Sequence, residues 1–197
     1  MITIKTPEQI ELLRKAGKIV GDTHNYLKQF IKPGITTKEL NRLAEEFILN
    51  SDATPSFKGL YGFPAGCCIS VNEEVVHGIP GNRRLKEGDI VSIDIGACYH
   101  GFHGDSAWTY PVGNISHPKA RLLRDTEQAL MEGLSVIKNG AHVGDIGYAV
   151  EKYATEHRLG VVKELVGHGV GSSVHEEPDV PNYGKKGTGP ELKTGMV

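Results

Sequence analysis

The sequence is poor in cysteine, has no long apolar run and carries no excess of positive charge, and each absence excludes a class of protein. Three cysteines are too few for a disulfide framework, and they lack zinc-finger spacing. No apolar run could span a membrane, and the first residues lack the pattern of a signal peptide. A formal net charge of −2 provides no basic field that would attract nucleic acid. We therefore expect a cytoplasmic protein without membrane or nucleic-acid partners.

Several common catalytic motifs are also missing. The chain contains no H-E-x-x-H helix, no G-x-S-x-G elbow, and no phosphate-binding G-x-x-x-x-G-K or G-x-G-x-x-G loop. These absences count against a zincin, a serine hydrolase and an enzyme that binds nucleotides or dinucleotides. A chain of 197 residues is still long enough to bury a substantial core.

Two aspartates in apolar surroundings are the most informative feature that is present. Asp94 lies in a predicted buried strand (90–96), and Asp105 lies on the strand that returns from it. A turn centred on Tyr99 and His100 predicts that the two carboxylates lie directly opposite, about 5 Å apart on one face. Buried carboxylates are costly unless they are hydrogen-bonded, paired or bound to a cation. The pair therefore predicts a divalent metal site, with a hydrogen-bonded structural pair as the alternative.

Three histidines could complete or assist such a site. His168 lies between two glycines and would add a nitrogen ligand, which shifts the preference from magnesium toward transition metals. His77 follows an apolar run, where it could be catalytic or could only cap the end of a strand. His175 comes seven residues after His168, an odd number that would place the two on opposite faces of a regular strand. We therefore expect a bend at Ser172 and Ser173.

Apolar residues at helical spacing predict a helix from Thr6 to Ile31. A capping box formed by Thr36 and Glu39 predicts the start of a second helix. We expect six further histidines on helix faces or in loops: His24, His100, His103, His117, His142 and His157. Only His103 is close enough to Asp105 in the sequence to approach the predicted site.

The apolar pattern also recurs along the chain. Residues 31–47 resemble residues 137–153 at an offset of 106, and residues 85–90 resemble residues 192–197 at an offset of 107. Elements that match in register predict an internal duplication, with halves at about 6–112 and 113–197. The counterpart of Asp94 would then lie four residues beyond 197. We therefore expect a single catalytic domain, 1–197, that is incomplete at its C-terminal end.

These features together resemble type I methionine aminopeptidases of the bacterial kind. The resemblance runs from residue 6 to residue 197 and depends on six motifs: SVNE (70–73), VHGIP (76–80), GDIVSID (88–94), GFHGD (101–105), GHGVG (167–171) and HEEP (175–178). It implies an α+β pita-bread (creatinase/aminopeptidase) fold, in which two pseudo-symmetric halves each carry helices over antiparallel strands.

The resemblance also implies a function. It implies a metalloprotease that removes the initiator methionine from nascent proteins, using water activated by two divalent ions (cobalt, manganese, iron or zinc). The partners would be the N-terminal peptides of nascent chains, with the ribosome as a further candidate, and we expect a monomer. A prolidase or aminopeptidase P relative, or a non-catalytic peptide-binding module on the same fold, is the alternative.

Site residues follow from the same resemblance. Three residues match the family's metal ligands, the second of them bridging both ions: Asp94, Asp105 and His168. His77 corresponds to a histidine near the amino end of the substrate, and His175 to one that stabilises the scissile carbonyl or the tetrahedral intermediate. Four residues fall where the family builds its methionine pocket: Phe57, Leu60, Phe63 and Cys68.

The sequence departs from the family in two respects. Two glutamate ligands and a pocket tryptophan would lie beyond residue 197, so we expect the 197 residues alone to be inactive. Leu60 stands where an aromatic residue is common. The retained ligands nevertheless favour an enzyme over a metal-free module, and the short N-terminal segment counts against a prolidase.

Overall fold

The computed structural model describes all 197 residues, and its contacts divide the chain into two compact units. The larger unit comprises Glu11–Ala120 together with Ser172–Val174. The smaller unit comprises Met1–Ile10, Arg121–Gly171 and His175–Val197. None of the helices combines the length and the hydropathy needed to cross a bilayer.

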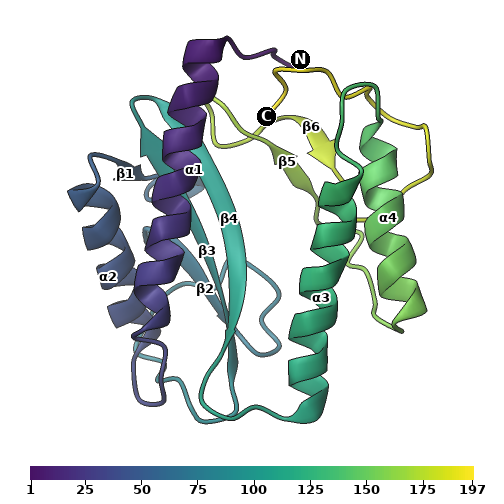
Figure 1. Ribbon diagram of the computed structural model, residues 1–197. Helices are drawn as coiled ribbons and strands as arrows, with labels where there is room; N and C mark the ends of the chain where they lie inside the picture. Colours follow the sequence, from purple (N-terminus) through teal and green to yellow (C-terminus); the bar gives the residue numbers. More distant parts are fainter. The chain divides into compact units, whose positions relative to one another are not determined.

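The larger unit is an antiparallel sheet covered by two helices (Figure 1). Its strands are ordered β1–β3–β2, and β4 also pairs with β3. The elements, in chain order, are most of α1 (Pro7–Lys28), α2 (Thr37–Asn50), β1 (Thr54–Pro55), a 3-10 turn η1 (Leu60–Gly62), β2 (Cys67–Val71), β3 (Ile90–Tyr99) and β4 (Phe102–Pro111).

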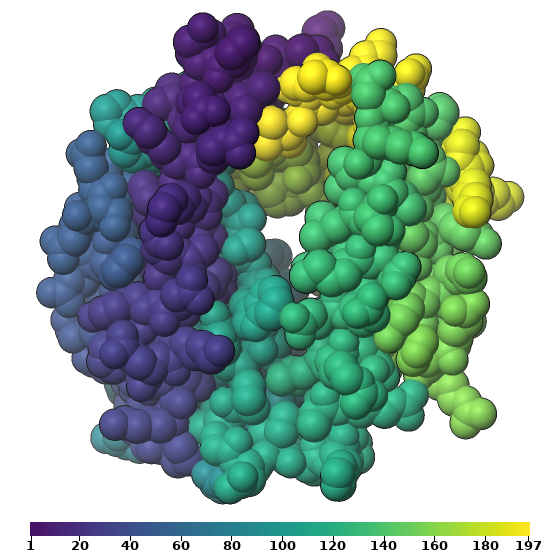
Figure 2. Space-filling view, in the orientation of Figure 1, coloured from purple at the N-terminus to yellow at the C-terminus, as the bar shows by residue number.

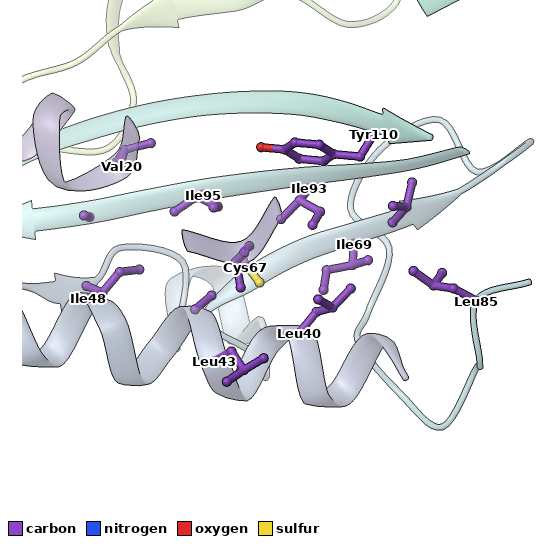
Figure 3. Close-up of a cluster of buried hydrophobic side chains, with 14 of the residues drawn as sticks. Val20, Leu40, Leu43, Ile48, Cys67, Ile69, Leu85, Ile93, Ile95 and Tyr110 are labelled. Carbon is purple, nitrogen blue, oxygen red and sulfur yellow. The ribbon is translucent and has the colours of Figure 1, made fainter. Parts of the chain in front are cut away.

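Alternation along β3 gives the sheet two different faces. Val91, Ile93 and Ile95 are fully buried and pack with apolar residues of α1 and α2. Figure 3 shows two of them, Ile93 and Ile95, among the other buried side chains of this core. Successive side chains of a strand point to opposite faces, so Asp94 lies on the face away from this core. We call the two sides the core face and the site face. The core is therefore the support on which the site face is built.

Helices α1 and α2 both begin at the residues that the sequence predicts. The Thr6 hydroxyl accepts a hydrogen bond from the Gln9 amide (3.3 Å), and the Gln9 side chain accepts one from the Thr6 amide (2.9 Å). This reciprocal pair begins α1. The Thr36 hydroxyl accepts a hydrogen bond from the Glu39 amide (3.1 Å), so α2 begins where predicted. The predicted capping box is only half formed, because the Glu39 carboxylate bonds Arg42 and not the Thr36 amide.

The β3–β4 hairpin corrects the predicted register. The chain turns at His100 and Gly101, one residue later than expected, so Asp105 pairs with Gly96. Both turn residues have positive φ angles (48° and 83°), the pattern of a two-residue type I′ turn. The prediction that Asp94 and Asp105 lie directly opposite is therefore wrong. They are diagonal neighbours that share the site face.

The smaller unit contains most of α3 (His117–Ser135), α4 (Val143–Glu156) and a two-stranded antiparallel sheet of β5 (Gly167–Gly169) and β6 (Glu176–Val180). Gly133 lets the helices approach closely, because a Cβ atom there would lie 2.8 Å from the side chain of Val150. Figure 2 shows the surface of α3 in green, on which four large apolar side chains are exposed: Leu122, Leu130, Met131 and Leu134.

The two units repeat one pattern of backbone hydrogen bonds. In the larger unit the Gly34 amide donates to the Leu85 carbonyl (2.8 Å), and in the smaller unit the Gly140 amide donates to the Leu192 carbonyl (2.8 Å). Helices α2 and α4 are both 14 residues long, and α4 begins 106 residues after α2. These spacings are the offsets at which the sequence repeats.

Candidate metal centre and active site

The site face of the larger unit carries the two aspartates. Asp94 lies on β3 and Asp105 on β4, and the two carboxyl groups are hydrogen-bonded to each other. Burial, followed by the charge of Asp94 and this hydrogen bond, raises the pKa of Asp105 to about 8. Without a cation, the pair therefore retains a proton near neutral pH. A divalent cation could take the place of that proton, since carboxylate oxygens suit such ions.

Cys68 borders the carboxylate pair. It is paired with Asp94 across β2 and β3, so its side chain also lies on the site face. Burial first, and then the charges of Asp94 and Asp105, raise the pKa of the Cys68 thiol to about 12. The thiol therefore stays neutral at physiological pH, so it can line a pocket but does not provide a thiolate ligand.

The four residues predicted to line a pocket come together in the larger unit. Phe57 and Cys68 are buried in one cluster, and Leu60 and Phe63 pack against it half-buried. Val174 completes the cluster. No signal in the sequence places Val174 in this cluster, because the residue is distant in sequence and follows a segment expected only to bend.

His77 is held in an unusual backbone conformation at the edge of the larger unit. Its φ angle is +58°, which is uncommon for any residue other than glycine. The next residue, Gly78, accepts a hydrogen bond from the Ile69 amide (2.8 Å) and donates one to the Ser70 hydroxyl (3.1 Å). A Cβ atom at Gly78 would lie 2.1 Å from the Ile69 oxygen, so only glycine lets the segment dock here. The backbone that carries the exposed His77 side chain is thereby anchored to β2.

His168 lies on β5 in the smaller unit, and its hydrogen bond defines its tautomer. The ring nitrogen Nδ1 lies 2.9 Å from the carbonyl oxygen of Gly169. Because a carbonyl oxygen only accepts hydrogen bonds, Nδ1 carries the hydrogen, and in the neutral imidazole Nε2 then carries the lone pair. Histidines that bind metals are commonly oriented by this kind of bond. The imidazole therefore has the form that a metal ligand needs.

His175 lies beside His168 within the smaller unit. The two ring centroids are 4.3 Å apart, and the ring planes meet at 65°. The chain bends through Gly171–His175 before β6 begins, so the predicted bend at Ser172 and Ser173 is confirmed. This bend lets residues an odd number of positions apart bring their side chains together.

An ion pair holds the start of β6, next to His175. The Lys5 ammonium lies 2.5 Å from Oε2 of Glu176, and both side chains are largely buried (5% and 15% exposed). The Thr3 hydroxyl donates a hydrogen bond to the same oxygen (3.0 Å). A Cβ atom at Gly171 would lie 2.2 Å from Oε1 of Glu176, so the carboxylate lies directly against this glycine.

The predicted ligands are divided between the units. Asp94 and Asp105 meet in the larger unit, whereas His168 belongs to the smaller one. Within neither unit do three histidine, cysteine, aspartate or glutamate side chains form a group that could hold a metal ion. The donor chemistry still fits a divalent transition metal, because the chain offers a buried carboxylate pair and an imidazole in the ligating tautomer.

One of the six histidines expected on helix faces or in loops is also buried. His24, on α1, is 8% exposed, and its ring contacts Ser106 and Tyr110 of β4. Burial lowers its pKa, while the bond to the Ser106 carbonyl and the charge of Asp94 oppose this shift. The signal in the sequence was a polar ring on an otherwise apolar helical stripe.

Comparisons with known proteins give the family. Residues 11–197 match metallopeptidase family M24. Over its whole length the chain is 55% identical to methionine aminopeptidase 1 of Bacillus subtilis and 53% identical to methionine aminopeptidase of Clostridium perfringens. It covers 79% of each of these proteins. The chain belongs to the methionine aminopeptidases of family M24.

Solved structures agree with this membership. The crystal structure of methionine aminopeptidase from Rickettsia prowazekii superimposes with a TM-score of 0.97 at 41% identity, over all of this chain and 79% of that one. Prolidase from Pyrococcus furiosus superimposes with a TM-score of 0.83 at 24% identity, over 98% of this chain and 55% of that one, which shows a shared fold alone. The predicted α+β pita-bread fold and the predicted family are confirmed. As a methionine aminopeptidase, the chain is a metallopeptidase.

Proposed function

We propose that the protein removes the initiator methionine from nascent polypeptides by metal-dependent hydrolysis of the first peptide bond. The observation that carries the proposal is the pair of hydrogen-bonded carboxyl groups on the site face, retained in a chain of this family. Burial and the charge of Asp94 raise the pKa of Asp105, so the doubly charged form of the pair lacks a stabilising charge that a cation would supply.

We assign the metal ligands as Asp94, Asp105 and His168. Together they would hold two divalent ions, with cobalt, manganese, iron and zinc as the candidates. Such ions supply a hydroxide at neutral pH and polarise the peptide carbonyl. The part of the chain in this chemistry is to present the two carboxylates from a rigid hairpin and the imidazole from β5.

The two remaining histidines would contact the substrate. His175 packs edge-on against the ring of His168, which places a second imidazole beside the ligand. There its N–H group would stabilise negative charge that develops on the scissile carbonyl oxygen. His77, anchored through Gly78 to β2, would bind near the amino end of the substrate.

The apolar cluster around Phe57 would bind the methionine side chain. Its walls are two phenylalanines, a leucine, a valine and a neutral thiol, and none of these groups carries charge at pH 7. Thioether sulfur makes favourable contacts with aromatic rings. The cluster lies on the same face of the sheet as Asp94, through Cys68.

The same proposal has implications for the substrates, the cellular location, the oligomeric state and the origin of the two units. We infer that the substrates are the N-terminal peptides of newly made chains, that the enzyme acts in the cytoplasm where they are made, and that it acts as a monomer. We further infer that the two units arose by internal duplication, which the repeated hydrogen bonds of Gly34 and Gly140 support.

The test is hydrolysis of short peptides by the purified full-length protein. The metal-free protein is loaded in turn with Mn²⁺, Co²⁺, Fe²⁺ or Zn²⁺ and given Met-Ala-Ser, Leu-Ala-Ser and Ala-Pro. We expect release of free methionine from the first peptide with at least one metal, and little cleavage of the other two. Cleavage of Ala-Pro in preference to Met-Ala-Ser would assign the protein to prolidase chemistry instead.

A further inference from the structure

We propose that His24 is a positioning residue for Asp105, because it fixes the stretch of β4 that carries this carboxylate. The inference rests on the proposed function only in taking Asp105 as a metal ligand. His24 touches neither the substrate nor the metal in this proposal. It acts through the backbone of β4.

Helix α1 contacts β4 on both sides of Asp105. On one side is Gly104, where a Cβ atom would lie 2.6 Å from the backbone nitrogen of Gly17. On the other side is Ser106, whose carbonyl oxygen lies 3.0 Å from Nε2 of His24. Both chain neighbours of Asp105 are thus held by one helix. The carboxylate between them points to the opposite face of the sheet.

The bonding pattern of the His24 ring has a defined direction. The Ser106 carbonyl oxygen can only accept, so Nε2 carries the hydrogen and donates it. Nδ1 is then the acceptor, and the hydroxyl of Tyr110, 3.0 Å away, is its donor. The same hydroxyl also points at the His24 carbonyl oxygen (3.3 Å), so its single hydrogen is shared between this oxygen and Nδ1. The ring therefore ties α1 to two positions of β4 that are four residues apart.

For packing alone, an apolar residue would be at least as favourable as histidine at this position. His24 lies on a stripe of α1 where Val20 and Leu27 are fully buried. A leucine here would fill the space but would remove the hydrogen bond to the Ser106 carbonyl. The imidazole is therefore explained by the bond that it makes. That bond fixes the peptide plane between Ser106 and Ala107, one residue beyond Asp105.

The consequence is expected at the metal. Groups that orient a metal ligand from the second shell typically contribute 10- to 100-fold to metal affinity. His24 orients the backbone of Asp105 and not its side chain directly, so we expect a loss toward the lower end of that range when the Ser106 bond is removed.

Two substitutions separate this bond from the rest of the ring. In His24→Gln, the side-chain amide reaches the place of Nε2 and can still donate to Ser106. In His24→Asn, the shorter amide reaches the place of Nδ1 and can contact only Tyr110. Thr23→Val is the matched control: Thr23 is the preceding residue of α1, is fully buried, and donates only to the Ile19 carbonyl of its own helix (2.7 Å).

The readout is Mn²⁺ binding to the metal-free full-length protein, measured by isothermal titration calorimetry and electron paramagnetic resonance, with no substrate present. We expect His24→Asn to weaken Mn²⁺ binding about tenfold or more, and His24→Gln and Thr23→Val to stay within about threefold of wild type. The melting temperature of each metal-free variant shows whether it is folded. A folded His24→Asn protein that binds Mn²⁺ as wild type does would overturn the proposal, and so would an equal loss in Thr23→Val.

The result also separates this inference from the proposed function. If wild type binds no Mn²⁺, the metal assignment of Asp105 fails and the inference fails with it. If wild type binds Mn²⁺ and removes methionine while His24→Asn does both equally well, only the inference fails. Should His24→Asn not fold, Tyr110→Phe keeps the Ser106 bond, and its Mn²⁺ affinity must then stay within about threefold of wild type; a larger loss counts against the proposal.

Discussion

The rings of His168 and His175 lie 4.3 Å apart and meet at 65°, although the two residues are an odd number of positions apart in the chain. The Gly169 carbonyl fixes one ring through Nδ1, and the second ring packs against it. The two imidazoles, to which we assign different roles, are therefore both held in place by the bond between His168 and the Gly169 carbonyl. A substitution that moves one ring is expected to disturb the other.

The first prediction concerns the negative charge of Asp105, which we propose as a metal ligand. Asp105→Asn keeps the shape of the side chain but removes a negative ligand, so we expect turnover of Met-Ala-Ser to fall more than about 100-fold, exceeding the usual effect of losing a second-shell partner. Steady-state kinetics at saturating Mn²⁺ measure this. Ser92→Ala is the control: Ser92 lies on the same face of β3 and bonds only the Thr109 hydroxyl (2.8 Å). Near-normal turnover in Asp105→Asn would refute the ligand assignment.

The second prediction concerns pH and the stability of the metal-free protein. The pKa of Asp105 is raised in the folded state above its value in the unfolded chain, so the folded state binds more protons. Its contribution to stability is therefore fully present below about pH 4 and is lost as the pH rises through about 8. One such group changes the free energy of unfolding by at most about 1.4 kcal/mol per pH unit.

Urea unfolding of the metal-free protein between pH 5 and pH 9 measures this slope. We expect wild type to lose stability relative to Asp105→Asn across that interval, and saturating Mn²⁺ to reduce the difference between pH values by replacing the proton. Parallel curves for the two metal-free proteins would show that the raised pKa does not contribute to folding.

The third prediction concerns the buried ion pair of the smaller unit. Lys5→Met leaves the Glu176 carboxylate without its cation, and breaking such a buried pair costs about 3–5 kcal/mol. Because Glu176 retains some exposure, we expect about 2–3 kcal/mol, measured by urea unfolding. Adding Glu176→Gln should recover part of this loss. The exposed pair Lys152–Glu156 provides the control, since Lys152→Met should change stability by less than about 0.5 kcal/mol.

The fourth prediction concerns the packing of α1 on β4. Gly104→Ala would place a Cβ atom 2.6 Å from the backbone of Gly17, so the helix must move, at a cost of about 1–3 kcal/mol. Gly21→Ala is the control on the same helix, where a Cβ atom meets nothing within 4 Å. That substitution should stabilise the protein by about 0.5–1 kcal/mol through helix propensity. Thermal unfolding measures the stability of both variants. Equal changes in melting temperature would contradict the close approach of α1 to β4 at Gly104.

Features that depend on sequence neighbours could be predicted. The hydroxyl of Thr36 caps α2 as expected, because capping needs only residues three positions apart. The apolar run around Asp94 predicted β3 for the same reason. The hairpin register was wrong because it depends on the backbone of His100, which adopts a positive φ angle that histidine rarely takes. The glycine that follows it was the available signal for a turn one residue later.

Features that depend on distant contacts could not be predicted. His24 resembles any polar residue on an amphipathic helix until the Ser106 carbonyl of β4 is placed beside it. Val174 joins the cluster of Phe57 and Cys68 from far along the chain. Both contacts arise only when the helix and the late bend are folded against the sheet. The predicted metal ligands stay a prediction.

The most direct test is anomalous diffraction from crystals of the full-length protein grown with Mn²⁺. The account predicts anomalous density within bonding distance of both the Asp94 and Asp105 carboxylates, lost in a crystal of Asp105→Asn. Crystals at saturating Mn²⁺ with no anomalous density at these two side chains would contradict it.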